Sequence, residues 1–229
     1  MESQSDLRSQ IKKLLVSKSG LKQQIFDNTN ALFGELKEAM HEFSTEIDEE
    51  LDDRIDKRIR IEYSDRGKFE AQIQLAGDLL VFVMHTNVFN FERDHRIWQN
   101  PYVQADSNNA YCGVINIYNF LADSMKFKRE EDEGYLIGRI FVNREGKFFV
   151  EGKRQERWRV EEFGSESISR EAILEILERA ILYSLGFDLL VPAYDTVKHV
   201  TAEQFLSRQE NTKLQTGKRL GYEFRSDDI

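Results

Sequence analysis

Residues 69–85 read FEAQIQLAGDLLVFVMH, and this stretch decides the fold. From Phe69 to Leu75 apolar and polar residues alternate, which predicts a strand with one buried face and one wet face. The run at 79–85 is largely apolar on both faces and predicts an interior strand that is covered on both sides. Only Ala76-Gly77-Asp78 separates the two runs, and so short a connection favours antiparallel pairing.

Similar strand patterns recur before and after this stretch. Residues 64–68 and 143–147 are turn-type segments, and Gly146 suits a positive φ. Each turn separates two runs with strand character. The additional expected strands are 59–63, 114–120, 136–142 and 148–150. We therefore expect a meandering, mainly antiparallel sheet of about six strands.

The N-terminal region is helical in pattern. With polar Asn28 counted as one step, apolar residues recur every three or four positions from 21 to 55, which predicts a long helix that lies across one face of the sheet. A shorter apolar stripe at Leu7, Ile11, Leu14 and Leu15 precedes it. We expect residues 17–20 to separate two helices, with Ser19 as the N-cap of the second helix and Gly20 as the residue that ends the first.

A second long helix is expected near the C-terminus. Arg170–Leu185 is apolar around most of its circumference and should be deeply buried. Helices and a meandering sheet together predict an α+β fold, with the sheet between the helices. The expected organisation is an N-terminal helical segment at 1–58, an α+β body at 59–208 and a polar C-terminal arm or tail at 209–229.

Composition sets outer limits on function. The chain has 229 residues, of which 40 % are hydrophobic, and this fraction suffices for a core. A formal charge of −9 weighs against broad binding to nucleic acids or acidic membranes. The single cysteine, Cys112, excludes an internal disulfide and a Cys-rich zinc site. The polar N-terminus and the absence of an apolar run of ~20 residues predict a cytoplasmic protein without an export signal or a membrane span.

Residues 42–56 contain eight acidic residues and one arginine. A charge run of this kind usually forms the solvated face of a helix. It can also be a docking surface for a basic partner, which would be carried by Glu46, Glu49, Glu50 and Asp53. A third hypothesis is that the run binds a divalent cation, although its acidic residues lack the spacing of a known calcium-binding loop.

The richest polar cluster of the chain follows the interior strand at 79–85. Histidine and carboxylate groups at a strand end can form an acid–base pair, a metal site or a small-ligand pocket. His85 can equally be a histidine at the edge of the core, since it shares a strand face with Val81 and Val83. Asn116 and Tyr118 share a face on another strand. The candidate ligand-binding residues are His85, Asn87, Asp94, His95, Asn116 and Tyr118.

Other motifs give weaker signals. Glu151-Gly152-Lys153 has the Glu-x-Lys pattern of some metal-dependent nucleases, in which carboxylates hold Mg²⁺ and the lysine orients water. A neighbouring strand would have to supply an acid, but residues 136–142 offer only Arg139. Glycine-rich nucleotide-binding motifs are absent from the sequence. Acidic residues lie next to the clusters of basic residues, which weighs against a nucleic-acid-binding surface. We therefore expect no cofactor, no metal and no nucleic-acid partner.

The runs GYLIGRIFVN at 134–143 and QTGKRLG at 215–221 resemble those of an uncharacterised family of bacterial cytoplasmic proteins. The similarity extends over most of the chain. The family has no assigned activity, so the resemblance implies a bacterial cytosolic protein and transfers no catalytic residue.

Two functions of different classes follow from these patterns. The first is a non-catalytic interaction or regulatory module that acts through partner docking and self-association as a homodimer, which the acidic run and the lack of a catalytic signature favour. The second is a small-ligand sensor or hydrolase with a pocket near His85 and His95. A metal-dependent nuclease that uses Glu151 and Lys153 is a variant of the second. The pocket hypothesis requires both histidines to face one cavity.

Overall fold

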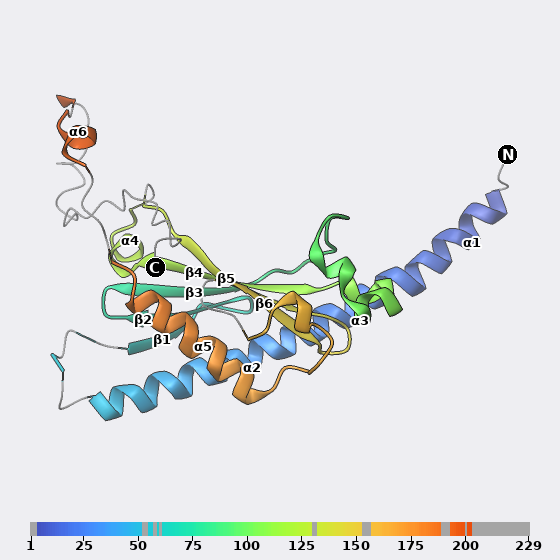
Figure 1. Cartoon of the computed structure of the whole chain (residues 1–229), viewed down its shortest axis with the longest axis horizontal. Helices are drawn as coiled ribbons and strands as arrows, with labels where there is room; N and C mark the ends of the chain where they lie inside the picture. The colour runs from blue at the N-terminus through green and yellow to red at the C-terminus, as the bar shows by residue number, and fades with distance from the viewer. Residues whose placement is uncertain are drawn as a thin grey trace.

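The computed structural model describes residues 4–51, 55–56, 59, 61–129, 132–152, 157–188, 193–199 and 201–202. A long helical rod runs along a six-stranded antiparallel sheet, and a second helix lies beside the rod (Figure 1). This arrangement confirms the expected α+β class, the meandering sheet and the long N-terminal helix on one face. The expected arm at 209–229 lies outside the described residues.

The strands follow one another in chain order across the sheet. They are β1 (Ile61–Asp65), β2 (Glu70–Leu75), β3 (Asp78–Met84), β4 (Gly113–Leu121), β5 (Tyr135–Val142) and β6 (Phe148–Gly152), each antiparallel to the next. Ala76 and Gly146 adopt φ values of 53° and 69° in the turns before β3 and β6. β1 starts at Ile61 and not at 59, because Ile61 pairs with Leu75, the last residue of β2.

The N-terminal helices form one continuous rod. It comprises α1 (Gln4–Leu14), the π-helical turn η1 (Leu15–Ser19) and α2 (Gly20–Leu51), and is about 72 Å long at 1.5 Å per residue. The expected break at 17–20 is wrong, because Gly20 has right-handed helical φ and ψ of −61° and −43°. The helix instead continues through residues 15–19 as a π-helical turn, in which the Ser17 hydroxyl donates a hydrogen bond to the carbonyl of Lys13.

Both long helices, α2 and α5 (Arg170–Leu185), pack on the same face of the sheet. The main core joins Phe33 and Leu36 of α2 to Phe82 of β3 and Ile176 of α5, all of them buried. The expectation that the sheet lies between these two long helices is therefore wrong (Figure 1). A sheet whose strands are apolar on both faces does not reveal which face a given helix will cover.

The α5 helix has the bounds expected from its sequence. Ser169 begins it, because its hydroxyl accepts a hydrogen bond from the N–H of Ala172. Its burial is one-sided, however, since Leu182 and Leu185 are 63 % and 56 % exposed. The expected burial of this helix is confirmed on the face that contacts the sheet and α2, whereas Leu182 and Leu185 lie on its exposed face.

The opposite face of the sheet is covered at one end by the long connection between β3 and β4. Ile97, Val103 and Cys112 of this connection form a second core with Phe141 and Phe149 of the sheet. The connection contains η2 (Arg96–Gln99), α3 (Pro101–Ala105) and η3 (Ser107–Ala110); the remaining elements are α4 (Ala122–Lys126), η4 (Val160–Glu162) and α6 (Tyr194–Val197). None of the helices in the described ranges combines the length and the apolar character needed to cross a bilayer.

Candidate functional site

A pocket of about 470 Å³ opens between the sheet and the segment that follows β3. Cross-strand pairing places Asn116, Arg139 and Glu151 in one polar row across β4, β5 and β6. The next row pairs Val114 with Phe141 and supplies an apolar part of the floor. The lining residues are His85, Phe89, Asn90, Phe91, Glu92, Asp94, His95, Val114, Asn116, Arg139, Phe141 and Glu151.

Four of the six expected ligand-binding residues line this pocket, and two do not. The four are His85, Asp94, His95 and Asn116. Asn87 lies outside the lining and contributes only its backbone N–H, which donates to His85 Nδ1 at 3.0 Å. Tyr118 pairs with Val81 further along the sheet, past a register shift between residues 117 and 118. Both histidines thus line a single pocket.

The hydrogen bonds of the two histidines set their tautomers. His85 Nδ1 accepts from the N–H of Asn87, and His95 Nδ1 accepts from the N–H of Ile97 at 3.1 Å, at the start of η2. A ring nitrogen that accepts a hydrogen bond carries no proton, so each neutral imidazole has its proton on Nε2. Each ring therefore offers an N–H donor and has no free lone pair for general-base catalysis.

Glu151 is held from two sides. Its Oε2 accepts from Arg139 Nη2 at 2.5 Å, and its Oε1 lies 3.4 Å from His95 Nε2. The side chains of Glu151 and His95 are 31 % and 29 % exposed, so solvent screens the pairing and its contribution to stability is small. The network instead joins β5 and β6 to the segment after β3 and fixes the orientation of all three side chains.

The residue pattern did not predict that Arg139, Phe91 and Phe141 belong to the site. Phe91 packs against His95 and Phe141, with ring centroids 4.5 Å and 5.2 Å apart. Aromatic residues are interleaved with polar residues between positions 89 and 98, and this pattern could have predicted aromatic side chains in the lining of the pocket. Arg139 has no such signal, because its place beside Glu151 follows from the β5–β6 register.

The nuclease hypothesis stays a prediction. The carboxylate of Glu151 is engaged by Arg139 and His95, and Lys153 lies outside the described residues. In the part of the chain that the structure describes, no three His, Cys, Asp or Glu side chains are grouped as metal ligands.

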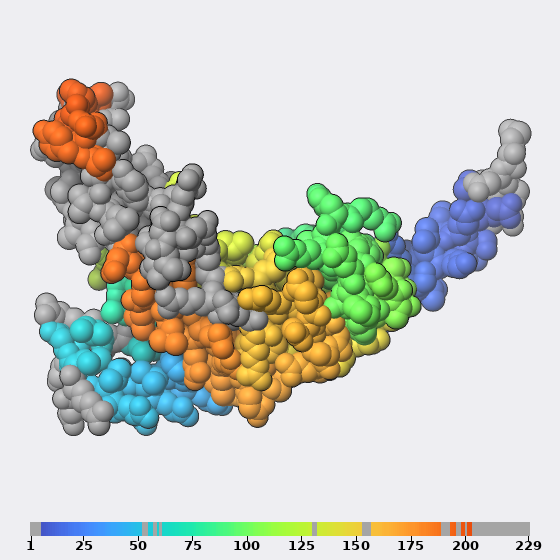
Figure 2. All heavy atoms as spheres, in the orientation of Figure 1, coloured from blue at the N-terminus to red at the C-terminus, as the bar shows by residue number. Residues whose placement is uncertain are grey.

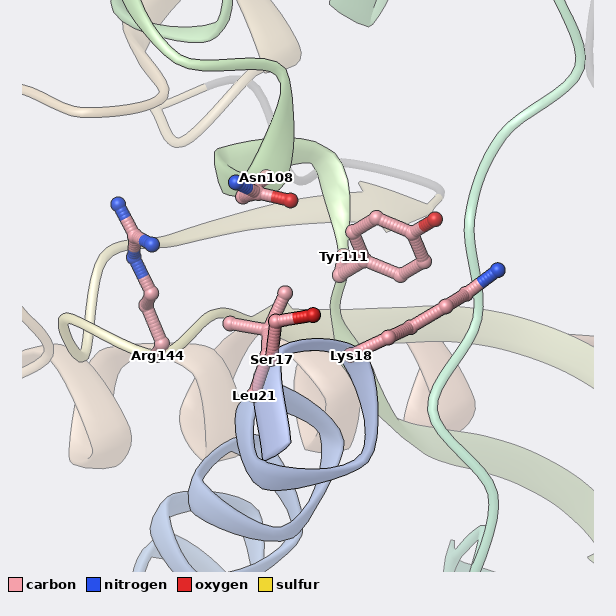
Figure 3. Close-up of a pocket in the computed structure, with 6 residues that line it drawn as sticks. All are labelled: Ser17, Lys18, Leu21, Asn108, Tyr111 and Arg144. Atoms are coloured by element: carbon pink, nitrogen blue, oxygen red, sulfur yellow. The ribbon is translucent and has the colours of Figure 1, made fainter. Parts of the chain in front are cut away.

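A second pocket of about 400 Å³ lies beside the π-turn (Figure 3). Its lining comprises Ser17, Lys18, Leu21, Asn108, Tyr111 and Arg144. The two cations point apart: Lys18 extends along Tyr111, with Nζ 6.0 Å from the ring centroid, whereas Arg144 extends on the other side. The guanidinium of Arg144 is also paired with Asp106 at 2.7 Å. Because these cations do not converge on one anion, the first pocket is the better candidate site.

The acidic run occupies the last turns of α2. Glu46, Glu49 and Glu50 are exposed there, and Asp53 lies outside the described residues. Phe43 and Ile47, on the same turns, are only half-buried. This end of the helix therefore combines exposed carboxylates with partly accessible apolar side chains.

Three comparisons with known proteins were made. Searches with protein-family models, of curated proteins and of solved structures each found no match. The resemblance to a bacterial family, together with the localisation that it implies, therefore stays a prediction.

Proposed function

We propose that the pocket beside His85 and His95 binds a small zwitterionic molecule, such as an amino acid, without converting it. One observation supports this proposal above all: hydrogen-bond donors and exposed carboxylates line the same pocket. A volume of about 470 Å³ lies within the range of small-molecule sites.

The donors lie on the strands or, for His85, directly after one, and they can bind a carboxylate group. His85 offers its Nε2–H, Asn116 its side-chain amide, and Arg139 its guanidinium. A guanidinium has five N–H donors in a planar fork, so Arg139 can serve a ligand while it holds Glu151.

The acceptors belong to the segment after β3 and suit an ammonium group. Glu92 and Asp94 are exposed members of the lining. Val114 and Phe141 supply apolar surface for the aliphatic part of a ligand. Charged groups of both signs beside an apolar floor favour a molecule that carries both charges over a simple anion or cation.

The imidazoles favour binding over catalysis. Neither His85 nor His95 has a free ring nitrogen to remove a proton, since each Nδ1 accepts from the backbone. A role as a sensor or carrier of its ligand follows more directly from this geometry than a role as a hydrolase.

Isothermal titration with the proteinogenic amino acids, their N-acetyl derivatives and their amides tests the proposal. We expect an amino acid to bind and both derivatives, each of which lacks one charge, to bind more weakly. Asn116→Ala should weaken binding about tenfold, whereas Asn87→Ala, outside the lining, should not. The proposal would be overturned if the derivatives bound as tightly as the amino acid, or if both variants lost affinity equally. It would also be overturned if none of these compounds bound.

A second candidate function, docking of a basic partner, is favoured by the exposure of Glu46, Glu49 and Glu50 at the end of α2. A designed helical peptide of lysine and leucine is the probe for this surface. Its fluorescence anisotropy should rise on binding and fall with added salt. Glu46→Gln with Glu49→Gln should weaken binding, and the matched pair Glu35→Gln with Glu38→Gln on the same helix should not. If both pairs weaken it alike, no docking surface exists there.

A further inference from the structure

The N-terminal end of the rod carries an apolar surface that nothing in the described chain covers. Leu7, Ile11, Leu14 and Leu15 are 46 %, 56 %, 57 % and 60 % exposed. Figure 2 shows α1 standing clear of the body, while α2 continues along it. Apolar side chains grouped on one exposed helix face mark a site of association.

Charge along the rod is segregated. Residues 4–25 include five basic residues and one acidic residue, and residues 26–51 include eight acidic residues and one basic residue. Asp48, Glu49 and Glu50 lie in the last turn of α2, where the negative end of the helix dipole disfavours them. A cationic helix placed antiparallel beside this end would relieve that repulsion.

We infer that α1 of one chain packs antiparallel against the last turns of α2 of a second copy. This inference rests on the partner-docking function proposed above and names the partner. The two surfaces lie at opposite ends of a rod of about 72 Å, so they cannot meet within one chain (Figure 1). Their charges are opposite, and each includes accessible apolar side chains.

The spacing of residues fits a single antiparallel register. Apolar residues at 7, 11 and 15 in the N-terminal part repeat every four positions, as do those at 43, 47 and 51 in α2. If Ile11 lies opposite Ile47, then Leu7 lies opposite Leu51 and Leu15 opposite Phe43. The same alignment brings charges together at two places, Arg8 with Glu50 and Lys12 with Glu46. One register thus satisfies both the apolar and the charged pattern.

Two copies cannot make this contact with each other twice, so each copy binds one neighbour through α1 and another through the end of α2. In a reciprocal pair with this register, the two-fold axis would pass the rod at Thr29, which lies halfway between Ile11 and Ile47. Thr29 is 0 % exposed and faces Gly113 of its own body, so a second rod cannot approach there. A head-to-tail contact that cannot close generates an open chain of copies. The assembly expected is therefore an open oligomer and not the homodimer expected from the sequence.

Sedimentation equilibrium tests this inference on the full-length protein. The mass should exceed the 26.9 kDa of one chain, grow with concentration past two copies, and fall with added salt. The variant Arg8→Glu with Lys12→Glu, and the variant Glu46→Lys with Glu50→Lys, should each weaken association at least about tenfold. Mixing the two variants should restore it, because each then offers a complement to the other. The matched variant Glu35→Lys with Glu38→Lys should associate like the wild type.

Several outcomes would overturn the inference. A wild-type mass of one chain at all concentrations, a mass that stops at two copies, or a mixture of the two variants that stays monomeric would each do so. Binding of the monomer to anionic vesicles through Arg8 and Lys12 would assign α1 to a membrane surface instead. If the lysine–leucine peptide still binds a strictly monomeric protein through Glu46, partner docking stands and only self-association fails.

Discussion

Asn143 holds three parts of the chain together with one buried side chain. Its Oδ1 accepts from the N–H groups of Glu145 and Lys147, which closes the β5–β6 turn. Its Nδ2 donates to the hydroxyl of Tyr102 at 2.9 Å, which ties that turn to α3. A fully buried amide that is satisfied on both sides is costly to replace, because removing it leaves its partners without hydrogen bonds.

The partner of Asn143 gives stability a dependence on alkaline pH. Burial, and then the hydrogen bond to Glu145, raise the pKa of Tyr102 to about 12. Since an unfolded tyrosine has a pKa near ~10, this group's contribution is complete below pH ~10 and is lost as the pH rises toward 12. We expect the difference in unfolding free energy between the wild type and Tyr102→Phe to be constant below pH ~10 and to shrink above it. Urea unfolding of both proteins measures this, and a difference that does not change up to pH 12 would contradict the expectation.

Cys112 should be chemically silent in the native protein. It is 0 % exposed in the second core, and burial raises the pKa of its thiol well above the usual range. We expect no reaction with a thiol-specific disulfide reagent at neutral pH until the protein unfolds. Absorbance of the released thiolate should report one thiol per chain in denaturant and none in buffer. Fast labelling in buffer would show that the second core opens.

Gly113 is required where α2 approaches β4. A methyl group added there would lie 2.0 Å from the hydroxyl oxygen of Thr29. We expect Gly113→Ala to lower the unfolding free energy by about 1–3 kcal/mol, the usual cost of overpacking. The control is Gly34→Ala, in open space on α2, which should raise stability by about 0.5–1 kcal/mol. The urea midpoints of the two variants should shift in opposite directions.

At the scale of elements, the two faces of α5 should differ sharply in their effect on stability. Leu177 is fully buried between the helix and the sheet, whereas Leu182 is 63 % exposed. We expect Leu177→Ala to cost about 2–5 kcal/mol and Leu182→Ala to stay within about 0.5 kcal/mol of the wild type. Thermal or urea unfolding compares them directly. A large loss at Leu182 would mean that the exposed face of α5 is covered in solution.

At the scale of the whole molecule, α1 should contribute little to the stability of the rest of the chain. Its residues from Asp6 to Leu14 are all exposed. We expect a chain that starts at Leu15 to keep the urea midpoint of the full protein, measured at a concentration where the full protein is monomeric, because no buried contact is lost. Circular dichroism should show a loss of helix only. A lower midpoint would mean that α1 packs against its own body.

The local pattern of residues was enough to predict the six strands, the two long helices α2 and α5, and the fold class. Period-two alternation indicated the first two strands, largely apolar runs between turn segments indicated the others, and the apolar stripe of α5 indicated its position near Arg170–Leu185. These features depend on residues within a few positions of one another, so they can be recognised without the fold. The same patterns brought His85 and His95 forward as candidates, because both belong to one short segment after a strand.

Long-range packing decided what local pattern could not. Arg139 meets Glu151 because of the β5–β6 register, and Asn116 joins them because of the β4–β5 register. Placement of α2 and α5 on one face, and the exposure of α1 beyond the edge of the sheet, depend on how much apolar surface each face has left to bury. The sequence by itself determined the six strands and the two long helices. Only the tertiary structure decided which side chains share a pocket and which apolar stripe remains exposed, because both depend on contacts between residues far apart in the sequence.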